Sequence, residues 1–431
     1  MGQPISVKRS VADYLLASKK CDLLSLEQLL RMGQLVVSIS NLVHALQRER
    51  GLSNIFVGSG GERFVQELPV GVKDARQMAQ LFHDRLAAID ICNGCLPGSS
   101  RLFSGIAYVI HGLEELDQVR EDIAALRITP EAIIDGYSEL IRGLLAVVFE
   151  AADAAADPAI SRTLVAMFHL MQGKELAGQE RAVGAAGFAR GHFDESLFER
   201  LHHLIENQER YFQTFTSFAD GQSLALWYAI AADDSALELE RLRRKAFTAG
   251  VEASVDQEVS SIWYGVTTRR IDNLKRVEDR LEASLSALCE ERIAEARHDL
   301  NIHQDRLEAL EQQPLECASF AIFLNDQSLA DTEVATKGYR SDCASTQLGR
   351  SLADLVQSQS ERLQAMSEEL HDARAALTER KTIEKAKGLI MKHRKMTEEH
   401  AYRFLREVAM AQRRKLSEVA ADTLNMAELL R

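Results

Sequence analysis

The 431-residue sequence is poor in the residues that typify sheets, tight turns and disulfide frameworks. Aromatic residues make up only 6% of it, and it holds six prolines and six cysteines. Few aromatics beside abundant Leu, Ala, Glu and Arg favour helices over a β-sheet. The cysteines are scattered and no secretory signal sequence precedes them, which argues against a disulfide-stapled secreted domain. We therefore expect a cytoplasmic protein.

Long apolar runs and metal-ligand patterns are also missing. No stretch of about 18 uninterrupted apolar residues occurs, so we expect no transmembrane helix and no membrane partner. Only Cys92 and Cys95 form a CxxC pair, and no second pair or histidine cluster completes a zinc site. The adjacent His202 and His203 would point in different directions on a helix. We expect neither a metal nor a resident cofactor.

Helix signals run through residues 24–313, the first expected domain. Pro130 and Pro158 each suit the first turn of a helix, and Thr129 and Asp157 are placed as the preceding caps. The pattern predicts about eight long helices, which suggests two four-helix bundles. The expected fold class is therefore all-α.

Two further segments are expected after this domain. Residues 314–346 have a mixed composition and are expected to form a linker. Within 347–431 a helix resumes with apolar residues spaced three and four apart, which predicts a short coiled-coil seam or an ordinary packed helix. Three helices then follow, so the second domain should end in a three-helix bundle. The seam residues are Leu363, Met366, Leu370, Ala373 and Leu377.

The stretch 380–415 reverses the charge of the chain. The whole sequence has a formal net charge of -13, whereas this stretch carries twelve Lys or Arg against four Glu. A basic segment in an acidic protein predicts a contact surface for a polyanion, although a solvated helical face has the same composition. Ile383, Ala386 and Ile390 keep helical spacing, so this segment should fold.

The runs AKGLIM, from Ala386, and EEHAYRFLREVAMAQRRKLSEVA, from Glu398, closely resemble the ANTAR domain. That family consists of RNA-binding antiterminators, and the resemblance has no gap. It implies that the domain binds paired small hairpins in a nascent leader mRNA and prevents a terminator from forming. The transcribing RNA polymerase would then be an indirect partner.

Two kinds of residue are expected at the RNA surface. Basic side chains would contact phosphates, small residues would allow close approach, and an aromatic ring would stack on an unpaired base. For Ala386 and Ala401, tight helix packing is an equally good explanation. The expected phosphate contacts are Lys385, Lys387, Lys392, Arg394, Lys395, Arg413 and Arg414, and the expected loop-reading residues are Ala386, Gly388, Ala401 and Tyr402.

An internal similarity relates two segments of the first domain. LQRERGLSNIFVGSG starts at Leu46 and AGQERAVGAAGFARG starts at Ala177, a constant offset of 131 residues. In both, a Glu-Arg pair precedes small residues, which let helices approach closely and bury the arginine. A buried guanidinium needs a partner, and its neighbouring glutamate faces elsewhere on the helix. The repeat predicts either a structural ion-pair network or two arginines, Arg50 and Arg181, that share one small planar anion.

The segment QRERGLS resembles the signature of the NIT domain, the nitrate- and nitrite-sensing domain of bacterial regulators. The resemblance implies an all-helical sensor in which arginines between two four-helix bundles bind nitrate or nitrite as the signal ligand. The implied ligands are Arg50 and Arg181, with Arg241 as the best match to a third family arginine, Arg243 and Arg244 as its close rivals, and Arg48 as a further candidate.

The combination of the two domains resembles nitrate-responsive antiterminators, so we expect a regulator and not an enzyme. No pair of carboxylates suited to catalysis is evident. The sequence is compatible with a homodimer. The alternative is an anion-sensing, DNA-binding regulator of transcription, although the turn at 394–396 lacks the glycine usual in a helix-turn-helix.

Overall fold

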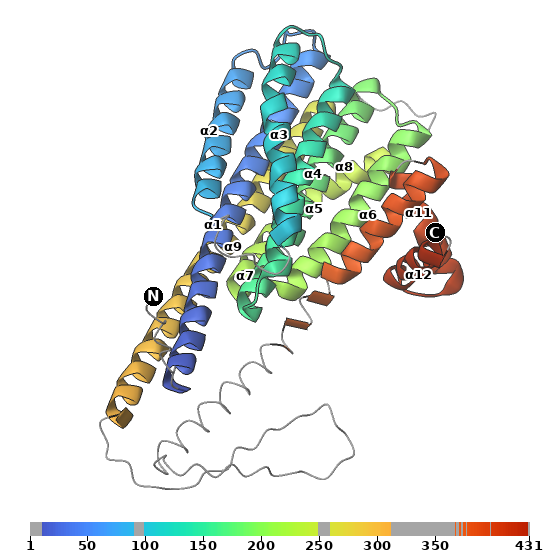
Figure 1. Ribbon diagram of the computed structural model, residues 1–431. Helices are drawn as coiled ribbons and strands as arrows, with labels where there is room; N and C mark the ends of the chain where they lie inside the picture. Colours follow the sequence, from blue (N-terminus) through green and yellow to red (C-terminus); the bar gives the residue numbers. More distant parts are fainter. Residues whose placement is uncertain are drawn as a thin grey trace, which may run out of the picture. The chain divides into compact units, whose positions relative to one another are not determined.

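The computed structural model describes residues 11–89, 99–248, 259–311, 377–396 and 398–429, with scattered positions between 367 and 375. Within these ranges the elements are helices and no strand occurs, which confirms the all-α prediction (Figure 1). The expected linker 314–346, the Cys92–Cys95 pair and most of the coiled-coil seam lie outside the described residues.

The sequence predicts about eight helices in the first domain, and its described residues form nine, of which α7 is the shortest with 11 residues. Its helices are α1 (Val11–Gly58), α2 (Glu67–Ala87), α3 (Ser99–Ala124), α4 (Pro130–Ala154), α5 (Pro158–Arg190), α6 (Glu195–Phe218), α7 (Gly221–Ala231), α8 (Asp234–Thr248) and α9 (Val259–Glu311). The C-terminal part holds a helical segment over 377–394, then α11 (Glu398–Gln412) and α12 (Leu416–Leu429).

Local side-chain chemistry sets several helix ends. Thr129 and Asp157 are the caps of α4 and α5, and each side chain accepts hydrogen bonds from backbone N–H groups of the first turn. Pro130 and Pro158 follow them at the first helical position, where a missing N–H is harmless. Helix α5 ends at Gly191, whose φ of 75° favours glycine. The predicted caps are therefore confirmed.

The chain divides into two compact units. One holds residues 1–27 and 290–371, and the other holds residues 28–289 and 372–431. All the contacts described below lie within the second unit.

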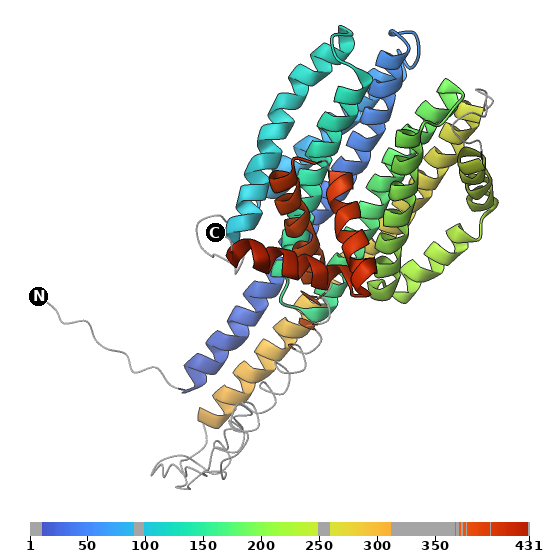
Figure 2. The ribbon, with the colours of Figure 1, turned by 90° about the vertical axis from the view of Figure 1, so that its right-hand side faces the viewer.

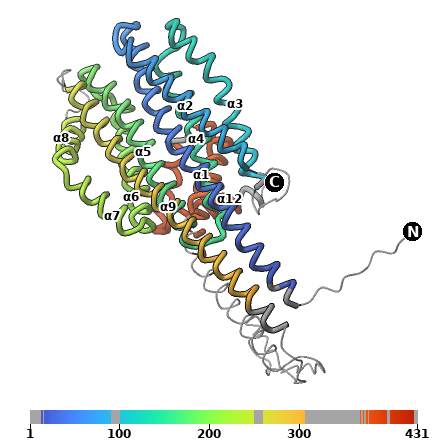
Figure 3. The backbone as a smooth tube through the Cα atoms, turned by 90° about the vertical axis from the view of Figure 1, so that its left-hand side faces the viewer, coloured from blue at the N-terminus to red at the C-terminus, as the bar shows by residue number. Residues whose placement is uncertain are grey.

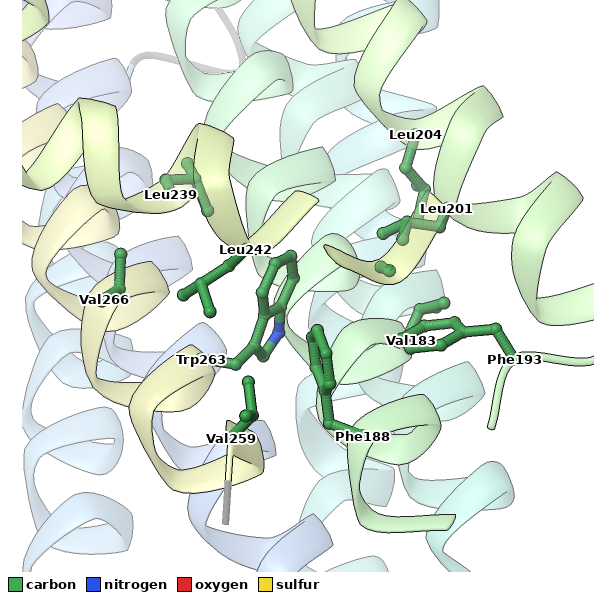
Figure 4. Close-up of a cluster of buried hydrophobic side chains, with 11 residues drawn as sticks. Val183, Phe188, Phe193, Leu201, Leu204, Leu239, Leu242, Val259, Trp263 and Val266 are labelled. Atoms are coloured by element: carbon green, nitrogen blue, oxygen red, sulfur yellow. The ribbon is translucent and has the colours of Figure 1, made fainter. Parts of the chain in front are cut away.

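Within the second unit, residues 28–289 of the first domain form two four-helix bundles. Helices α1 to α4 form one (Figures 1 and 2), and α5, α6, α8 and α9, which share one apolar core, form the other. Figure 4 shows the core of the second bundle, where the ring of Trp263 on α9 lies between side chains of α5 and α8. Trp263 is fully buried, and a Cβ built on Gly184 of α5 would lie 2.2 Å from it. Only glycine permits that approach.

Helix α1 belongs to the first bundle but also packs against the second. It runs alongside α9 (Figure 3), where a Cβ built on Gly33 would lie 3.5 Å from Leu285. By length and composition α1 is also able to cross a membrane from Leu16 to Gly58, yet 67% of its most apolar window is buried inside the protein. Burial of that kind is what a core helix shows, because its apolar face packs on other helices.

Candidate functional site

Arg50 of α1 reaches out of its own bundle. Its side chain is buried, with 4% of its surface exposed. The guanidinium holds Glu175 of α5 in a bidentate pair, with N–O distances of 2.6 and 3.2 Å, and it also donates to Ser138 Oγ of α4 at 2.7 Å. Arg50 thus links α1, α4 and α5 through a charge-assisted pair.

Arg181 of α5 reaches in the opposite direction, towards α1 and α9. It is 7% exposed, donates to Thr268 Oγ1 at 3.1 Å and lies 5.0 Å from the ring centroid of Tyr264. Burial lowers the pKa of Arg181, and the positive charge of Arg50 lowers it further. Each guanidinium therefore lies in the field of the other.

Glycines make this crossing of the two arginines sterically feasible. A Cβ built on Gly51 of α1 would lie 2.9 Å from Arg181 Nη2. A Cβ built on Gly178 of α5 would lie 2.9 Å from Arg50 Nη2. The small residues in the repeated sequence thus have a physical role, since a larger side chain at either position would displace a guanidinium.

The repeated glutamates face away from their neighbouring arginines, as expected for consecutive helical residues. Glu49 is fully buried and accepts from Arg120 of α3 at 2.8 and 2.9 Å and from Tyr137 of α4 at 2.7 Å. Glu180 is 1% exposed and accepts from Arg243 of α8 at 2.7 and 2.8 Å. Although burial opposes it, Arg243 holds the pKa of Glu180 below its usual range. The glutamates form the structural network, and the arginines cross between the bundles.

The structure separates the three candidates for a third arginine on α8. Arg241 and Arg244 are exposed, whereas Arg243 is buried and clamps Glu180. Arg243 is thus the rival that reaches the interior, and its partner is a carboxylate. Arg48 of α1 is exposed and pairs with Asp74 at 3.2 Å.

A cavity of about 460 Å³ adjoins Arg181. Its wall combines a cationic fork with a hydroxyl group, an aromatic ring and an imidazole, from Arg181, Thr268, Tyr264 and His44. Arg48, Asp272 and Glu67 bring further charges of both signs. A small planar anion matches the fork and the hydroxyl, because guanidinium donors lie in one plane. Sequence reasoning missed Thr268, Tyr264, Ser138 and Glu175, which lie far along the chain from the arginines that they contact.

The C-terminal helices pack around a small apolar core. Ala386 and Ala401 are fully buried in it with Leu405, so the packing explanation accounts for both alanines. Most of the expected phosphate contacts are exposed, and so is Gly388. The exposed basic residues are Lys385, Lys392, Arg394, Lys395, Arg413 and Arg414.

Three of the expected RNA-contact residues have partners or are covered: Lys387, Tyr402 and Arg414. Lys387 is 7% exposed and pairs with Glu384 at 2.8 Å. Tyr402, the expected stacking residue, is also 7% exposed. Its ring centroid lies 4.8 Å from the guanidinium carbon of Arg210 and 5.2 Å from the ring of His203, both on α6. Arg414, although exposed, pairs with acidic residues of α12.

Ion pairs flank the covered tyrosine, where α11 lies against α6 (Figure 2). Arg403 donates to Glu199 at 3.1 and 2.8 Å, and Arg406 donates to Glu206 at 2.5 and 3.1 Å. The α6 face thus occupies the side of α11 that carries Tyr402.

Comparisons with known proteins bear on both parts of the chain. Residues 41–286 match the family model described as nitrate and nitrite sensing, and residues 371–423 match the ANTAR domain. A nitrate regulatory protein from Klebsiella oxytoca is 32% identical over 421 residues, which cover 98% of this chain and 96% of that protein. The solved structure of the NasR transcription antiterminator matches with a TM-score of 0.57 and 31% identity, over 97% of this chain and 99% of that one.

Proposed function

Because this chain belongs to the family of NasR-type, nitrate-responsive transcription antiterminators, we propose that nitrate or nitrite is its signal ligand and binds at the crossed arginines. The observation that carries this proposal is the pair Arg50 and Arg181: both are buried, the charge of Arg50 acts on Arg181, and Arg181 lines a cavity. Nitrate is planar, singly charged and weakly hydrated, so a fixed guanidinium fork suits it better than a flexible ammonium group. The signal is bound and released unchanged, so no enzymatic step is needed.

The output is RNA binding by the C-terminal domain. We propose that its target is paired hairpins of a leader mRNA in the cytoplasm, and that the transcribing RNA polymerase is affected only indirectly. The exposed lysines and arginines between 385 and 414 supply phosphate contacts, and Tyr402 supplies a ring on which an unpaired base can stack. The homodimer stays a prediction, since no step of this proposal requires a second copy.

The contact between α6 and α11 suggests how the sensor domain controls the RNA-binding domain. Tyr402 is covered by α6, so the docked arrangement hides the stacking residue. Arg403–Glu199 is an exposed ion pair, which water and salt screen strongly. The docked arrangement is therefore weakly held, within the range that differential ligand affinity can overcome.

A hydrogen bond connects the helix that carries Arg181 to the contact between α6 and α11. Glu180, next to Arg181 in the sequence, accepts from Gln208 of α6 at 2.7 Å. Gln208 lies between Glu206 and Arg210, which both contact α11. A shift of α5 on anion binding would thus reach the part of α6 that covers Tyr402. We propose that the anion favours the undocked domain.

A gel-shift comparison tests this function. The full chain is mixed with an RNA that carries two small hairpins, or with duplex DNA of the same sequence, with and without nitrate. Nitrate should raise the affinity for the RNA and leave the affinity for DNA low. Equal binding to duplex DNA would instead favour the DNA-binding alternative.

A further inference from the structure

A cluster of ionisable side chains lies in the interior where α1, α5 and α9 meet. Lys174 of α5 and Glu278 of α9 are fully buried and form an ion pair. Glu278 also accepts a hydrogen bond from the hydroxyl of Ser40 on α1, which is fully buried as well. Ser40 precedes Arg50 by two to three helical turns of α1, a distance of about 15 Å at 1.5 Å per residue. The cluster is therefore distinct from the crossed arginines.

The Ser40 hydroxyl lies between two carboxyl groups of α9. Besides contacting Glu278, its oxygen is 2.5 Å from Oε1 of Glu282, which is one helical turn further along α9. The ammonium group of Lys275, also on α9, donates to the same hydroxyl oxygen at 3.1 Å. Three ionisable groups of one helix thus converge on a single small side chain of another.

A serine hydroxyl has one proton to donate and two lone pairs that accept, which limits the charge of its neighbours. The Ser40 oxygen accepts from Lys275 and donates to one carboxylate only. The second carboxyl group, within hydrogen-bond distance of the same oxygen, can face it favourably only as a donor. Because a carboxyl group donates only when it is protonated, the arrangement is complete when one of the two glutamates carries a proton.

Glu282 is the glutamate that fits this role. Burial would raise the pKa of Glu278, but the charges of Lys174 and Lys275 hold it below its usual range. Burial raises the pKa of Glu282, and the negative charge of Glu278 reinforces this shift against the opposing charge of Lys275. Lys275 also pairs with Asp279 at 2.8 Å. Glu278 and Asp279 thus balance the two lysines without a charge on Glu282.

His44 of α1 is a further titratable group that faces this cluster. Burial lowers its pKa to about 3, and the positive charge of Lys174 lowers it further. Lys275 and Arg48 act in the same direction, whereas Glu278 opposes the shift. The imidazole is therefore neutral near about pH 7 and adds no charge to the cluster there.

We propose that Glu282 keeps a proton above the pH at which an exposed glutamate ionises, and that this proton joins α9 to α1 through Ser40. In this arrangement Glu282 donates to Ser40, and Ser40 donates to Glu278. When the proton leaves as pH rises, two carboxylates face one hydroxyl, and their repulsion weakens the contact between α1 and α9. The proton site makes the sensor domain responsive to pH and does not depend on the proposed function.

The direction of the pH effect follows from the shift. A glutamate of the unfolded chain titrates near about 4.3, and the pKa of folded Glu282 is raised. The folded chain therefore binds the proton more tightly than the unfolded chain. The resulting stabilisation is fully present below about pH 4.3 and is lost as pH rises through the folded pKa. His44 titrates in the opposite sense, so the contribution of Glu282 has to be measured as a difference between variants.

Glu282→Gln tests the proposal in the full chain, because a glutamine amide donates to Ser40 and accepts from Lys275 without needing a proton. Urea unfolding of both proteins from about pH 4.5 to about pH 8 gives the ratio of their unfolding equilibrium constants. The wild-type constant should rise relative to that of the variant as pH rises, by at most about tenfold per pH unit, because one proton is involved.

A matched control and an opposite outcome make this test decisive. Glu290→Gln, the same substitution at an exposed position of α9, should give a ratio to the wild type that does not change with pH. If Glu282 is instead ionised and paired with Lys275, Glu282→Gln removes that ion pair and becomes less stable than the wild type as pH rises. That result, or a ratio for Glu282→Gln that does not change with pH, overturns the proposal.

Infrared spectroscopy detects the proton independently of stability. At about pH 6, where ordinary carboxyl groups are ionised, the wild type should show the C=O stretching band of a protonated carboxyl group. Glu282→Gln should lose this band and Glu290→Gln should keep it. Ser40→Ala, a small change that removes the acceptor of the proton, should lose it too. A wild type without the band, or a Ser40→Ala variant that retains it in full, overturns the proposal whether or not Glu282→Gln folds.

Discussion

Two glutamates that precede the crossing arginines lie in the interior, and each is held by an arginine from another helix of its own bundle. Glu180 has Arg243 as its bidentate partner, Arg270 at 3.5 Å and Gln208 at 2.7 Å. Burial lowers the pKa of Arg270 to about 10, and the charge of Arg243 adds to this. Such a cluster is stable only while its charges stay paired, because unpaired buried ions are costly.

Removing one member of this cluster should therefore destabilise the protein. Arg243→Met leaves Glu180 without its bidentate partner and should lower the free energy of unfolding by about 3–5 kcal/mol. Arg241→Met, two residues away on the exposed face of α8, should change it by no more than about 0.5 kcal/mol. Urea denaturation of both variants measures the difference. If both variants lower the free energy of unfolding equally, the ion pairs of Glu180 do not contribute specifically to stability.

Buried histidines should make the first domain acid-sensitive. Burial lowers the pKa of His44 to about 3 and that of His169 to about 4. The unfolded chain, with histidine pKa values near about 6.5, binds these protons more readily than the folded chain. Stability is therefore fully present above about pH 6.5 and is lost as pH falls towards about 4.

The measurement is the free energy of urea unfolding at a series of pH values across that window. His44→Gln removes one of the two titrating groups, so the decline should become shallower in this variant. A wild-type stability that rises on acidification across the same window would contradict the assignment of neutral, buried imidazoles.

Part of this site follows from the sequence, and part does not. The repeat predicted the arginines Arg50 and Arg181 and the role of small neighbours, because both are local properties of one helix. Their partners are not local: Glu175 lies 125 residues from Arg50, and Thr268 lies 87 residues from Arg181. The family resemblance gave Arg241 as the best match and Arg243 as a close rival, and only the packed bundle shows that Arg243 lies on the buried face of α8.

At the scale of elements, the helices and their caps were predictable because the determining contacts span only a few residues. Thr129 and Asp157 each bind backbone N–H groups within their own first turn. The contact of α11 with α6 was not predictable. Its ion pairs join residues about 200 positions apart, and nothing in the composition of either helix distinguishes them from solvated charges.

This helix contact gives a prediction about the output. Glu206→Lys turns the attraction to Arg406 into a repulsion and should raise RNA affinity in the absence of nitrate. Glu195→Lys makes the same charge change on an exposed position of α6 and is the matched control. A filter-binding assay without nitrate compares the two.

Comparing the RNA affinities of the two variants distinguishes loss of the α6–α11 contact from a general effect of added positive charge. If both raise RNA affinity equally, added positive charge explains the change. If neither does, the docked arrangement does not restrain the RNA-binding domain. Only a rise confined to Glu206→Lys supports restraint by α6.

At the scale of the whole molecule, RNA binding and anion binding depend on different charged regions. The chain carries a formal net charge of -13, while the segment 380–415 is basic. A polyanion is repelled by most of the surface and attracted to this segment, so RNA is directed to the C-terminal helices. The proposed site of the small anion is instead a cavity lined by Arg181, a buried cation whose charge salt screens less.

The central claim is that an anion at the crossed arginines controls RNA binding by the C-terminal domain. The most direct test is the affinity of the full chain for a two-hairpin RNA, measured with and without nitrate, for the wild type and for Arg181→Ala. Nitrate should raise wild-type affinity by about 5-fold to 150-fold, the usual range of allosteric coupling, and should leave Arg181→Ala unaffected. A wild type indifferent to nitrate, or an Arg181→Ala variant that responds as the wild type does, would contradict this account.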